Sequence, residues 1–390
     1  MVQLILDRLT RTMNNKRCTL LGVGPMSKNC VDATIEIANQ ASIPLMLIAS
    51  RRQIDSDEFG GGYVEHWTTR EFASYVRKND KRGNIFLARD HGGPWQNPAE
   101  ISASLGLRDA MESAKRSYAA DIDAGFQILH IDPSIDPYGL LRTEEVLDRV
   151  FELYEFCCSY AGQKNCEVAF EIGTEEQSGT TSSQQELRET LKQVFEFTEA
   201  NDLPGPSFVV VQTGTRVMEA RNVGTFDSPI RVVGEVPAEI LLPKMIEICN
   251  SFKILMKEHN TDYLSDESLA WHPRLGIHSA NVAPEFGVAE SRAFLNLCRE
   301  QGRSDLGDQF LQISLDSQKW KKWMLPNSLA SDEARAIIAG HYIFSDERFM
   351  SIKQSLQDHC SKKAIEVDSF LRSAVKTAVM RYVSLFRLAN

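Results

Sequence analysis

The sequence predicts an α/β fold, a (β/α)8 TIM barrel with a helical C-terminal extension. Two observations carry this prediction. Short apolar runs recur along the chain and end in polar or small residues, which is the pattern of parallel strands buried on both faces. Between these runs lie segments long enough for a helix, with apolar residues at three-to-four spacing. Strands and helices that alternate in this way form a parallel sheet, and eight of them fit a closed barrel.

Eight runs are the expected barrel strands. In chain order they span residues 18–23, 44–50, 84–90, 126–132, 166–173, 207–214, 252–259 and 274–281. The expected helices between and after them span residues 29–41, 69–77, 109–124, 143–160, 184–200, 238–251 and 286–302. The seventh strand has a rival, because residues 230–236 (IRVVGEV) also have the pattern of a strand, and 237–259 would then form one long helix. The apolar pattern alone leaves both assignments open.

The length of the chain sets the expected domain organisation. Its 390 residues suit a barrel of roughly 250 to 300 residues with an extension. We expect a barrel domain over residues 1–303 and a helical C-terminal extension, rich in charge, over residues 304–390. No Pro-, Gly- or Ser-rich linker in the sequence separates a further domain.

Composition excludes several classes of function. A net charge of −10 without a long Lys/Arg run gives no electrostatic footprint for nucleic acid. No apolar run approaches the length that spans a bilayer, and the first residues lack the apolar block of a signal peptide. The eight cysteines are scattered without a CxxC pair, as expected for reduced, packed thiols. We therefore expect a cytoplasmic protein that binds neither nucleic acid nor membrane.

Polar residues gather where the expected strands end. In a barrel these ends converge on one site, whatever their separation in sequence. Carboxylates and imidazoles drawn from several strands suit a borderline divalent ion such as Zn²⁺ or Mn²⁺, which can polarise a carbonyl and stabilise an enediolate. The residues concerned are Asp90, His91, Asp132, Glu171, Glu175, Gln212, Glu258, His259, Asp262, His278 and Asn281.

Each of these residues also has a structural interpretation. His91 could be a hydrogen-bonded loop residue, and Asp90 and Asp132 could cap the helices that follow them. The Arg51-Arg52 pair could bind a phosphate or carboxylate through paired hydrogen bonds, or lie on the surface as many arginines do. We expect His130, inside its strand, to be a buried histidine with its hydrogen bonds satisfied. These alternatives stay open on the sequence alone.

The order and spacing of short motifs resemble a known family. The motifs are Gln53 followed by 59–61 (FGG), Asp90-His91 with Gly93-Pro94, 124–126 (AGF) leading to 130–132 (HID), 172–175 (IGTE), 210–212 (VVQ), 261–263 (TDY), 320–322 (WKK) and Ser345-Asp346. Over about residues 19–345, the chain resembles the non-catalytic subunit of class II tagatose-bisphosphate aldolases and its ketose 4-epimerase relatives.

The resemblance implies a TIM barrel, and it implies roles for several residues. The family's Thr-Asp-Tyr element follows strand seven, which favours residues 252–259 as that strand. By the same match His91 and His259 fall at metal-binding positions, Asp90 falls at the acid/base position, and Glu175 and Gln212 fall at other strand ends that face the same centre. In the aldolase-subunit relatives strand eight carries a lysine, but this chain has Ser279 in the matching stretch and a histidine, His278, beside it.

We therefore expect a metal-dependent sugar aldolase or epimerase that acts on a ketose or ketose phosphate by retro-aldol chemistry. Asp90 would move the hydroxyl proton, with Asp132 or Glu175 as the second proton-transfer group. The expected metal ligands are His91, His259, Glu175 and Gln212, and the expected substrate-binding residues are Gln53, Arg51, Arg52, His278, Ser279 and Asn281. If Ser279 points into the barrel, His278 should point away from it unless the strand bulges.

The family also implies an alternative, a catalytically silent subunit that stabilises a separate class II aldolase. Homo-oligomerisation and a class II aldolase partner subunit are both open. A third interpretation rests on fold analogy alone, a sugar isomerase similar to xylose isomerase.

Overall fold

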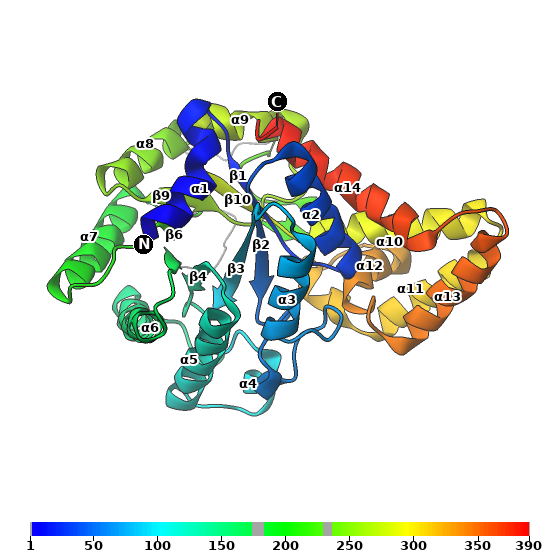
Figure 1. The fold of residues 1–390 in the computed structure, drawn as a ribbon, viewed down its shortest axis with the longest axis horizontal. Helices are drawn as coiled ribbons and strands as arrows, with labels where there is room; N and C mark the ends of the chain where they lie inside the picture. Colours follow the sequence, from blue (N-terminus) through cyan, green and yellow to red (C-terminus); the bar gives the residue numbers. More distant parts are fainter. Residues whose placement is uncertain (1, 174–182, 229–235, 390) are drawn as a thin grey trace.

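The computed structural model describes residues 2–173, 183–228 and 236–389, and it shows a closed barrel of eight parallel strands (Figure 1). Going round the barrel, the strands are β1 (Leu20–Val23), β10 (Ser279–Val282), β9 (Leu255–Glu258), β6 (Phe208–Val210), β5 (Ala169–Ile172), β4 (Ile128–Ile131), β3 (Ile85–Gly92) and β2 (Leu45–Ser50), which pairs again with β1. The predicted fold class is confirmed.

The seventh barrel strand lies where the family resemblance placed it. β9 pairs with β6 on one side and with β10 on the other, and it follows the helix α8 (Ala238–Ser251). The rival segment 230–236 lies outside the described residues except for its last position. The eighth strand begins later than predicted, because residues 274 and 275 end the helix α9 (Asp266–Leu275) and Gly276, with φ 93°, terminates it.

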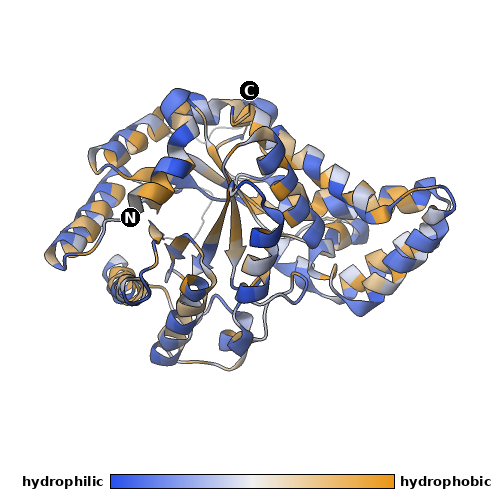
Figure 2. Ribbon diagram, in the orientation of Figure 1, coloured by the Kyte–Doolittle hydropathy of each residue, from blue (hydrophilic) through white to orange (hydrophobic). Residues whose placement is uncertain are grey.

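Helices surround the barrel and cover its outward-facing apolar side chains. They are α2 (Lys28–Ala41), α3 (Thr69–Asn79), α5 (Leu107–Ala124), α6 (Thr143–Lys164), α7 (Gln184–Ala200), α8, α9 and α10 (Pro284–Glu300). Capping boxes fix the start of two of them, Thr68 with Glu71 for α3 and Ser183 with Glu186 for α7. Apolar residues dominate the strands and the inward faces of these helices, whereas the outward faces are polar (Figure 2).

Short elements complete the barrel at both ends. The helix α1 (Val2–Asn15) precedes β1 and buries Ile5 and Leu9 in the main apolar core. On the side where the strands end lie the helix α4 (Pro98–Ser102), the short helix η1 (Asp57–Phe59) and a two-stranded hairpin of β7 (Val217–Met218) and β8 (Arg221–Asn222). Among the described helices, none is both long and apolar enough to span a bilayer.

The residues after 303 are mainly helical, as predicted. They form α11 (Ser304–Asp316), η2 (Lys319–Trp323), α12 (Asp332–Ala339), η3 (Gly340–Tyr342), α13 (Glu347–Ser361) and α14 (Val367–Leu385). The first of these build a second apolar cluster with α10, whereas the later part of α14 joins the core of the barrel. The division into two domains at residues 303 and 304 stays a prediction.

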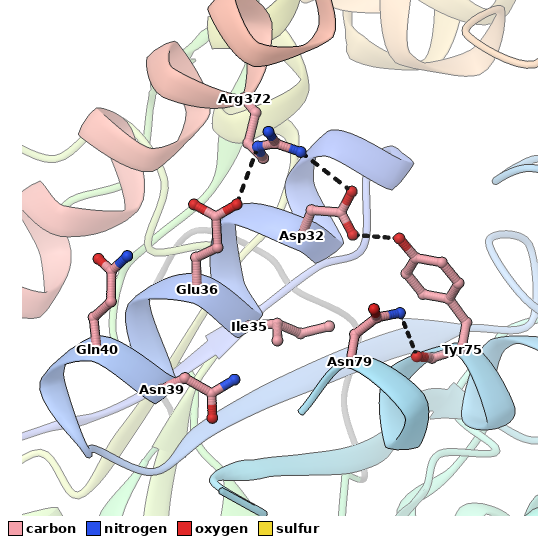
Figure 3. A pocket seen from close by; sticks show the side chains of 8 residues that line it. All are labelled: Asp32, Ile35, Glu36, Asn39, Gln40, Tyr75, Asn79 and Arg372. Atoms are coloured by element: carbon pink, nitrogen blue, oxygen red, sulfur yellow. Dashed lines mark hydrogen bonds and ion pairs between the residues drawn. The ribbon is translucent and has the colours of Figure 1, made fainter. Parts of the chain in front are cut away.

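The last helix returns to the outside of the barrel and packs on α2 (Figure 3). Arg372 of α14 pairs with Glu36 at 3.1 Å and with Asp32 at 3.7 Å, and Asp32 also accepts a hydrogen bond from Tyr75 of α3 at 2.5 Å. These groups line a groove between the three helices. Because the charges in it are paired with one another, the groove serves to attach α14 to the barrel.

Candidate active site

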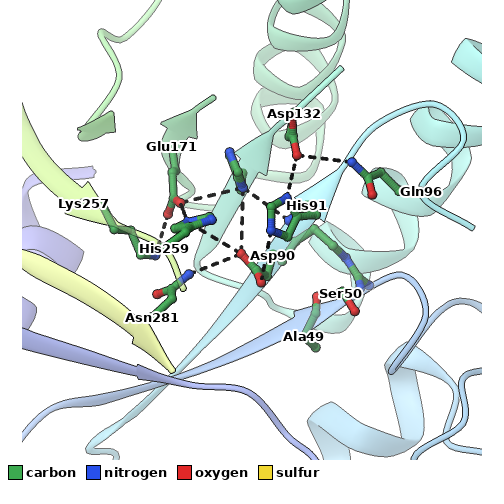
Figure 4. A network of polar contacts seen from close by, with 12 residues as sticks. Ala49, Ser50, Asp90, His91, Gln96, Asp132, Glu171, Lys257, His259 and Asn281 are labelled. Carbon is green, nitrogen blue, oxygen red and sulfur yellow. Dashed lines mark hydrogen bonds and ion pairs between the residues drawn. The ribbon is translucent and has the colours of Figure 1, made fainter. Parts of the chain in front are cut away.

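A cluster of carboxylates and imidazoles lies at the C-terminal ends of the strands β3, β4, β5 and β9 (Figure 4). Two sets of potential ligands overlap in it: His91, His130 and His259 form one, and Asp90, His130, Glu171 and His259 form the other. Within each set the candidate ligand atoms all lie within 4.8 Å of one another. β3 supplies Asp90 and His91, β4 supplies His130, β5 supplies Glu171, and His259 follows β9.

Asp90 is at the centre of this cluster. Its Oδ1 atom lies 3.9 Å from Nδ1 of His130 and 3.8 Å from Nε2 of His259, and its Oδ2 atom lies 3.9 Å from Nε2 of His91. Asn281 of β10 donates a hydrogen bond from Nδ2 to Oδ1 of Asp90 at 3.2 Å. Burial acts to raise the pKa of Asp90, but the surrounding imidazoles outweigh it and hold the pKa well below its usual range. Asp90 is therefore a carboxylate.

An irregularity in β3 lets two consecutive residues reach one centre. In a regular strand Asp90 and His91 would point to opposite faces. Here the pairing of β3 with β4 shifts register between Arg89 and Gly92, and His91 has a φ of 47°, so the strand is bulged at this point. The following Gly93 has a φ of 146°, and a Cβ atom there would lie only 2.3 Å from the carbonyl oxygen of Asp132. Position 93 therefore needs glycine in this local geometry.

Asp132 orients His91. Its Oδ2 atom lies 2.6 Å from Nδ1 of His91 and accepts a hydrogen bond from Gln96 at 3.2 Å, while Ser134 binds its other oxygen. Burial acts to lower the pKa of His91, but the carboxylates of Asp90 and Asp132 outweigh it and raise the pKa to about 9. Because Nδ1 of His91 is held by a carboxylate, Nε2 faces the centre, as in histidines that bind a metal with a carboxylate behind them.

A buried ion pair lies beside the imidazoles. Lys257 of β9 donates from Nζ to Oε2 of Glu171 at 2.6 Å, and both side chains are 1% exposed. The other oxygen of Glu171 lies 3.0 Å from Nε2 of His259. Burial acts to raise the pKa of Glu171, but Lys257 and the histidines lower it to about 2. Burial, the largest influence, lowers the pKa of His259, so this imidazole is neutral and suited to act as a ligand.

The donor set fits a divalent metal ion. Three imidazoles and two carboxylates are ligands of Zn²⁺ and Mn²⁺, and they come from separate strand ends, as in other barrel sites. In the described part of the chain, Nδ1 of His259 and Nε2 of His130 are buried without a hydrogen-bond partner. Buried polar atoms without partners are unusual in a core that serves packing alone.

The structure brings several predicted residues together in this cluster. The ring centroids of His91 and His259 are 5.0 Å apart, and Asp90, Asp132 and Asn281 lie with them (Figure 4). The helix-capping interpretation of Asp132 is wrong, because the next long helix, α6, begins at residue 143 with Arg142 as its N-cap.

Three residues expected to bind substrate have other roles. Arg51 is buried, and its guanidinium pairs with Asp55 at 3.0 Å and with Glu100 at 2.6 Å. Gln53 accepts hydrogen bonds from the backbone N–H and hydroxyl of Ser50 at 2.9 and 3.0 Å, which closes the turn after β2. These two predictions are corrected, because neither side chain has a free polar group at the barrel mouth.

His278 is the third residue that was expected to bind substrate and has another role. It precedes β10, at the end of the barrel away from the cluster, where Nδ1 accepts a hydrogen bond from the backbone N–H of Met256 at 3.0 Å. Burial lowers the pKa of His278 to about 4. A role at the site is therefore excluded by position, and the alternative in which it points away from the centre is the one observed.

The structure gives the positions of three further predicted site residues but does not test their roles. Ser279 is fully buried next to Lys257 in the sheet register; two residues before Asn281, it lies one layer deeper in the barrel. Gln212 is buried just past β6, and Arg52 is half-buried after β2. Glu175 lies outside the described residues. The roles proposed for Ser279, Gln212, Arg52 and Glu175 stay predictions.

Glu258 and Asp262 face away from the cluster. Glu258 accepts hydrogen bonds from Thr261 at 2.7 Å and from His272 at 2.6 Å, on the side of α9. Asp262 accepts hydrogen bonds from the first backbone N–H groups of α10, those of Ala283 and Glu285, at 3.0 and 2.9 Å. The Thr-Asp-Tyr element thus has a structural part to play, since it fixes the start of α10.

Two residues of the cluster were missed from the sequence. His130 was expected to be buried with its hydrogen bonds satisfied, and its Nδ1 atom does accept a hydrogen bond from the backbone N–H of His91 at 3.2 Å. The same atom also faces Asp90 and Glu171, and Nε2 has no partner among the described residues. Lys257 was passed over inside an apolar run. Strand alternation was the available signal, because His130 lies two residues before Asp132 and Lys257 lies two residues before His259.

The fold and the cluster define a class: a parallel (β/α)8 barrel whose mouth carries a set of metal-ligand side chains. The chain belongs to the D-tagatose-1,6-bisphosphate aldolase subunit GatZ/KbaZ-like family, which it matches over residues 5–201. The resemblance inferred from the sequence is thereby confirmed. No curated protein matches the chain significantly.

Solved structures share the fold over nearly the whole chain. One is described as a probable tagatose 6 phosphate kinase from Sinorhizobium meliloti 1021, with a TM-score of 0.74 at 18% identity, covering 94% of this chain and 100% of that one. The fructuronate-tagaturonate epimerase UxaE from Cohnella laeviribosi has a TM-score of 0.58 at 12% identity, covering 95% and 82%. The YdjI aldolase from Escherichia coli K12 has a TM-score of 0.52 at 12% identity, covering 99% and 97%. At these identities the likeness shows the fold alone.

Proposed function

We propose that this protein is a metal-dependent enzyme that acts on a ketose or ketose phosphate by retro-aldol chemistry, either cleaving the sugar or epimerising it. The observation that supports this most directly is the convergence of three imidazoles on the Asp90 carboxylate at the mouth of the barrel. The family, and an aldolase and an epimerase among proteins of the same fold, are consistent with it.

His91, His130 and His259 would hold the ion, Zn²⁺ or Mn²⁺, with Glu171 beside them. Gln212 and Glu175 remain proposed as further ligands. When bound, such an ion polarises the substrate carbonyl and stabilises the negative charge of an enediolate. Asp132 and Lys257 act as positioning residues, Asp132 through its hydrogen bond to His91 and Lys257 through its ion pair with Glu171.

Asp90 is the proposed base. Its carboxylate accepts the proton of the hydroxyl on the carbon beta to the carbonyl, and the bond between the alpha and beta carbons breaks. The electrons of that bond pass to the enediolate, and the beta carbon becomes an aldehyde. In cleavage, a second acid protonates the alpha carbon, and Glu175 is the residue proposed for this. In epimerisation, the bond forms again on the other face of the aldehyde, and Asp90 returns its proton to the new hydroxyl.

A second candidate function rests on the family description, which names a subunit. In that role the chain stabilises a separate class II aldolase, and the cluster at its mouth performs no reaction. The two candidates differ in what the purified chain does alone. An enzyme retains metal and turns over a sugar by itself, whereas a stabilising subunit needs the partner chain for any turnover.

Metal analysis of the purified protein tests the proposal. We expect about one divalent ion per chain, and we expect the double variant His91→Ala, His259→Ala to lose it. His359→Ala, on the surface helix α13, is the matched control and should retain the ion. Unchanged metal content in the double variant would refute the proposed site. A metal-loaded protein that turns over no ketose unless a class II aldolase chain is added would favour the subunit role.

A further inference from the structure

Two basic residues near the barrel mouth have no acidic partner among the residues that the structure describes. They are Arg52, directly after β2, and Lys322, in the short helix η2 of the C-terminal extension. Within the described part of the chain, neither side chain takes part in an ion pair or a hydrogen bond. The contrast with the neighbouring arginines is clear, since Arg51 pairs with Asp55 and Glu100, and Arg89 pairs with Asp121.

Both residues belong to segments at the end of the barrel where the strands end, Arg52 to the loop after β2 and Lys322 to η2, which is bonded to the hairpin after β6. Lys322 is exposed overall, and partial desolvation, followed by the charge of Arg52, lowers its pKa.

Aromatic residues pack around the two cations. The backbone N–H of Tyr63 donates to the carbonyl oxygen of Arg52 at 3.1 Å, and the ring of Tyr63 lies 4.8 Å from that of Tyr342. Nζ of Lys322 lies 5.1 Å from the centroid of the Tyr342 ring. The loop after β2 and the extension therefore meet here, and the contact is fixed by ring packing and cation–π attraction.

A buried histidine next to these rings lacks hydrogen-bond partners. His341 is 1% exposed, and its ring lies 4.0 Å from Tyr342 and 5.9 Å from Tyr63. Both of its ring nitrogens are buried without a partner in the described structure. Burial and then the charge of Lys322 hold its pKa well below the usual range, so it is neutral and has one N–H to donate. A buried donor of this kind is a costly feature that a ligand would satisfy.

We propose that Arg52 and Lys322, with the N–H of His341 beside them, bind the terminal anionic group of the sugar substrate, a phosphate or a carboxylate. This inference deepens the proposed function and rests on it. Two neighbouring cations repel each other, and an anion between them replaces this repulsion with charge-assisted hydrogen bonds. The guanidinium also offers paired donors that match phosphate and carboxylate geometry.

This assignment gives the extension a function at the site. η2 carries Lys322 to the mouth of the barrel, because the carbonyl of Trp323 accepts a hydrogen bond from Glu219 in the β7–β8 hairpin at 2.9 Å. The loop after β2 is held in turn by Ser345, whose hydroxyl accepts from the N–H of Glu65 at 2.8 Å. It also explains how a chain with serine at position 279 can recognise an anionic sugar, since the cations come from a different part of the fold.

Anion titration by calorimetry tests this inference with inorganic phosphate and acetate as probes. We compare the wild type with Arg52→Gln, Lys322→Gln and the double variant, each in the metal-free and the metal-loaded state. Removing one charged hydrogen-bond donor should weaken binding of the preferred anion about tenfold or more, and the double variant should bind neither probe. Lys321→Gln, an exposed neighbour in η2, is the matched control and should bind like the wild type.

The two sources of the anion are distinguished by the same titration and by sugar probes. Tighter binding of phosphate and of fructose 6-phosphate indicates a phosphorylated substrate, whereas tighter binding of acetate and of fructuronate indicates a sugar acid. Wild-type protein that binds neither probe, or an unchanged affinity in the double variant, overturns the anion site. Because the metal-free titration involves no turnover, failure of the proposed function would show separately, as absent metal or absent reaction.

Discussion

The buried ion pair between Lys257 and Glu171 allows a test of how much opposite charges in the site stabilise the fold. The perturbation is Lys257→Met, which keeps the length and apolar volume of the side chain and removes its charge. In the present structure Nζ of Lys257 lies 2.6 Å from Glu171, and both side chains are 1% exposed. After the change, the carboxylate of Glu171 remains buried, with the imidazoles of His259 at 3.0 Å and His130 at 3.7 Å as its close polar contacts among the described residues.

The expected magnitude follows from burial. Breaking a buried ion pair by removing one partner costs roughly 3 to 5 kcal/mol, because an uncompensated charge is left in the core. We expect the free energy of unfolding of the metal-free protein to fall by that amount. The double variant Lys257→Met, Glu171→Gln removes both charges and should recover most of the loss, which gives a coupling energy above about 2 kcal/mol. A bound cation next to Glu171 should make the single variant less destabilising.

Urea unfolding measures these values in the presence of a chelator and again with Zn²⁺. Lys192→Met is the matched control, because Lys192 pairs with Glu196 on the surface, with side chains 66% and 63% exposed, and such pairs contribute about 0 to 1 kcal/mol. A loss below about 1 kcal/mol in Lys257→Met, together with additive single and double variants, would refute the reasoning. It would mean that the barrel interior relaxes or admits water at this point.

Three further predictions concern the surroundings of the site and of α10. Asp132→Asn should weaken metal binding about 10- to 100-fold, because the partner of His91 changes from a carboxylate to an amide; equal metal retention on dialysis would contradict this. Gly93→Ala should cost about 1 to 3 kcal/mol in chemical unfolding, since its Cβ would meet the backbone of Asp132, whereas Gly139→Ala, where a Cβ meets nothing, should be near neutral. Glu290→Gln should change the pH dependence of stability. Burial raises the pKa of Glu290 to about 7, so the unfolded state loses its proton first, and Glu290 destabilises the fold increasingly as pH rises from about 4.5 to 7. The free energy of unfolding of the variant should therefore rise by up to about 3 kcal/mol at pH 8 relative to its change at pH 4.5. An equal change at both pH values would show that ionisation of Glu290 does not cause the effect.

The fold was predictable because its signal repeats. Eight buried strands and their helices each carry the same alternation of apolar runs and three-to-four spacing, and an error in one does not change the class of fold. The errors lie at element ends. The eighth strand was placed five residues too early, since Leu275 and Ile277 run on into 279–281 in the sequence, and the pattern does not show that Gly276 ends a helix.

The site was only partly predictable, because strand ends identify which residues converge and not which atoms have partners. Arg51 and Arg52 are adjacent and chemically alike, yet Arg51 is buried against Asp55 and Glu100 from other segments. Nothing in the local sequence distinguishes the two. His130 was passed over for a related reason, since a histidine inside a strand is usually satisfied, and only the neighbouring strands show that its Nδ1 faces two carboxylates.

The charges at the barrel mouth explain why a cation is the expected occupant. Asp90, Asp132 and Glu171 are three carboxylates with depressed pKa values, and they face two positive groups, Lys257 and the protonated His91. The excess of negative charge is buried and is maintained at a desolvation cost that a purely structural core would avoid. A divalent ion that displaces the proton of His91 would neutralise the excess. The bound ion would supply the positive charge that the oxygens of a sugar need, and Arg52 and Lys322 would attract its anionic end.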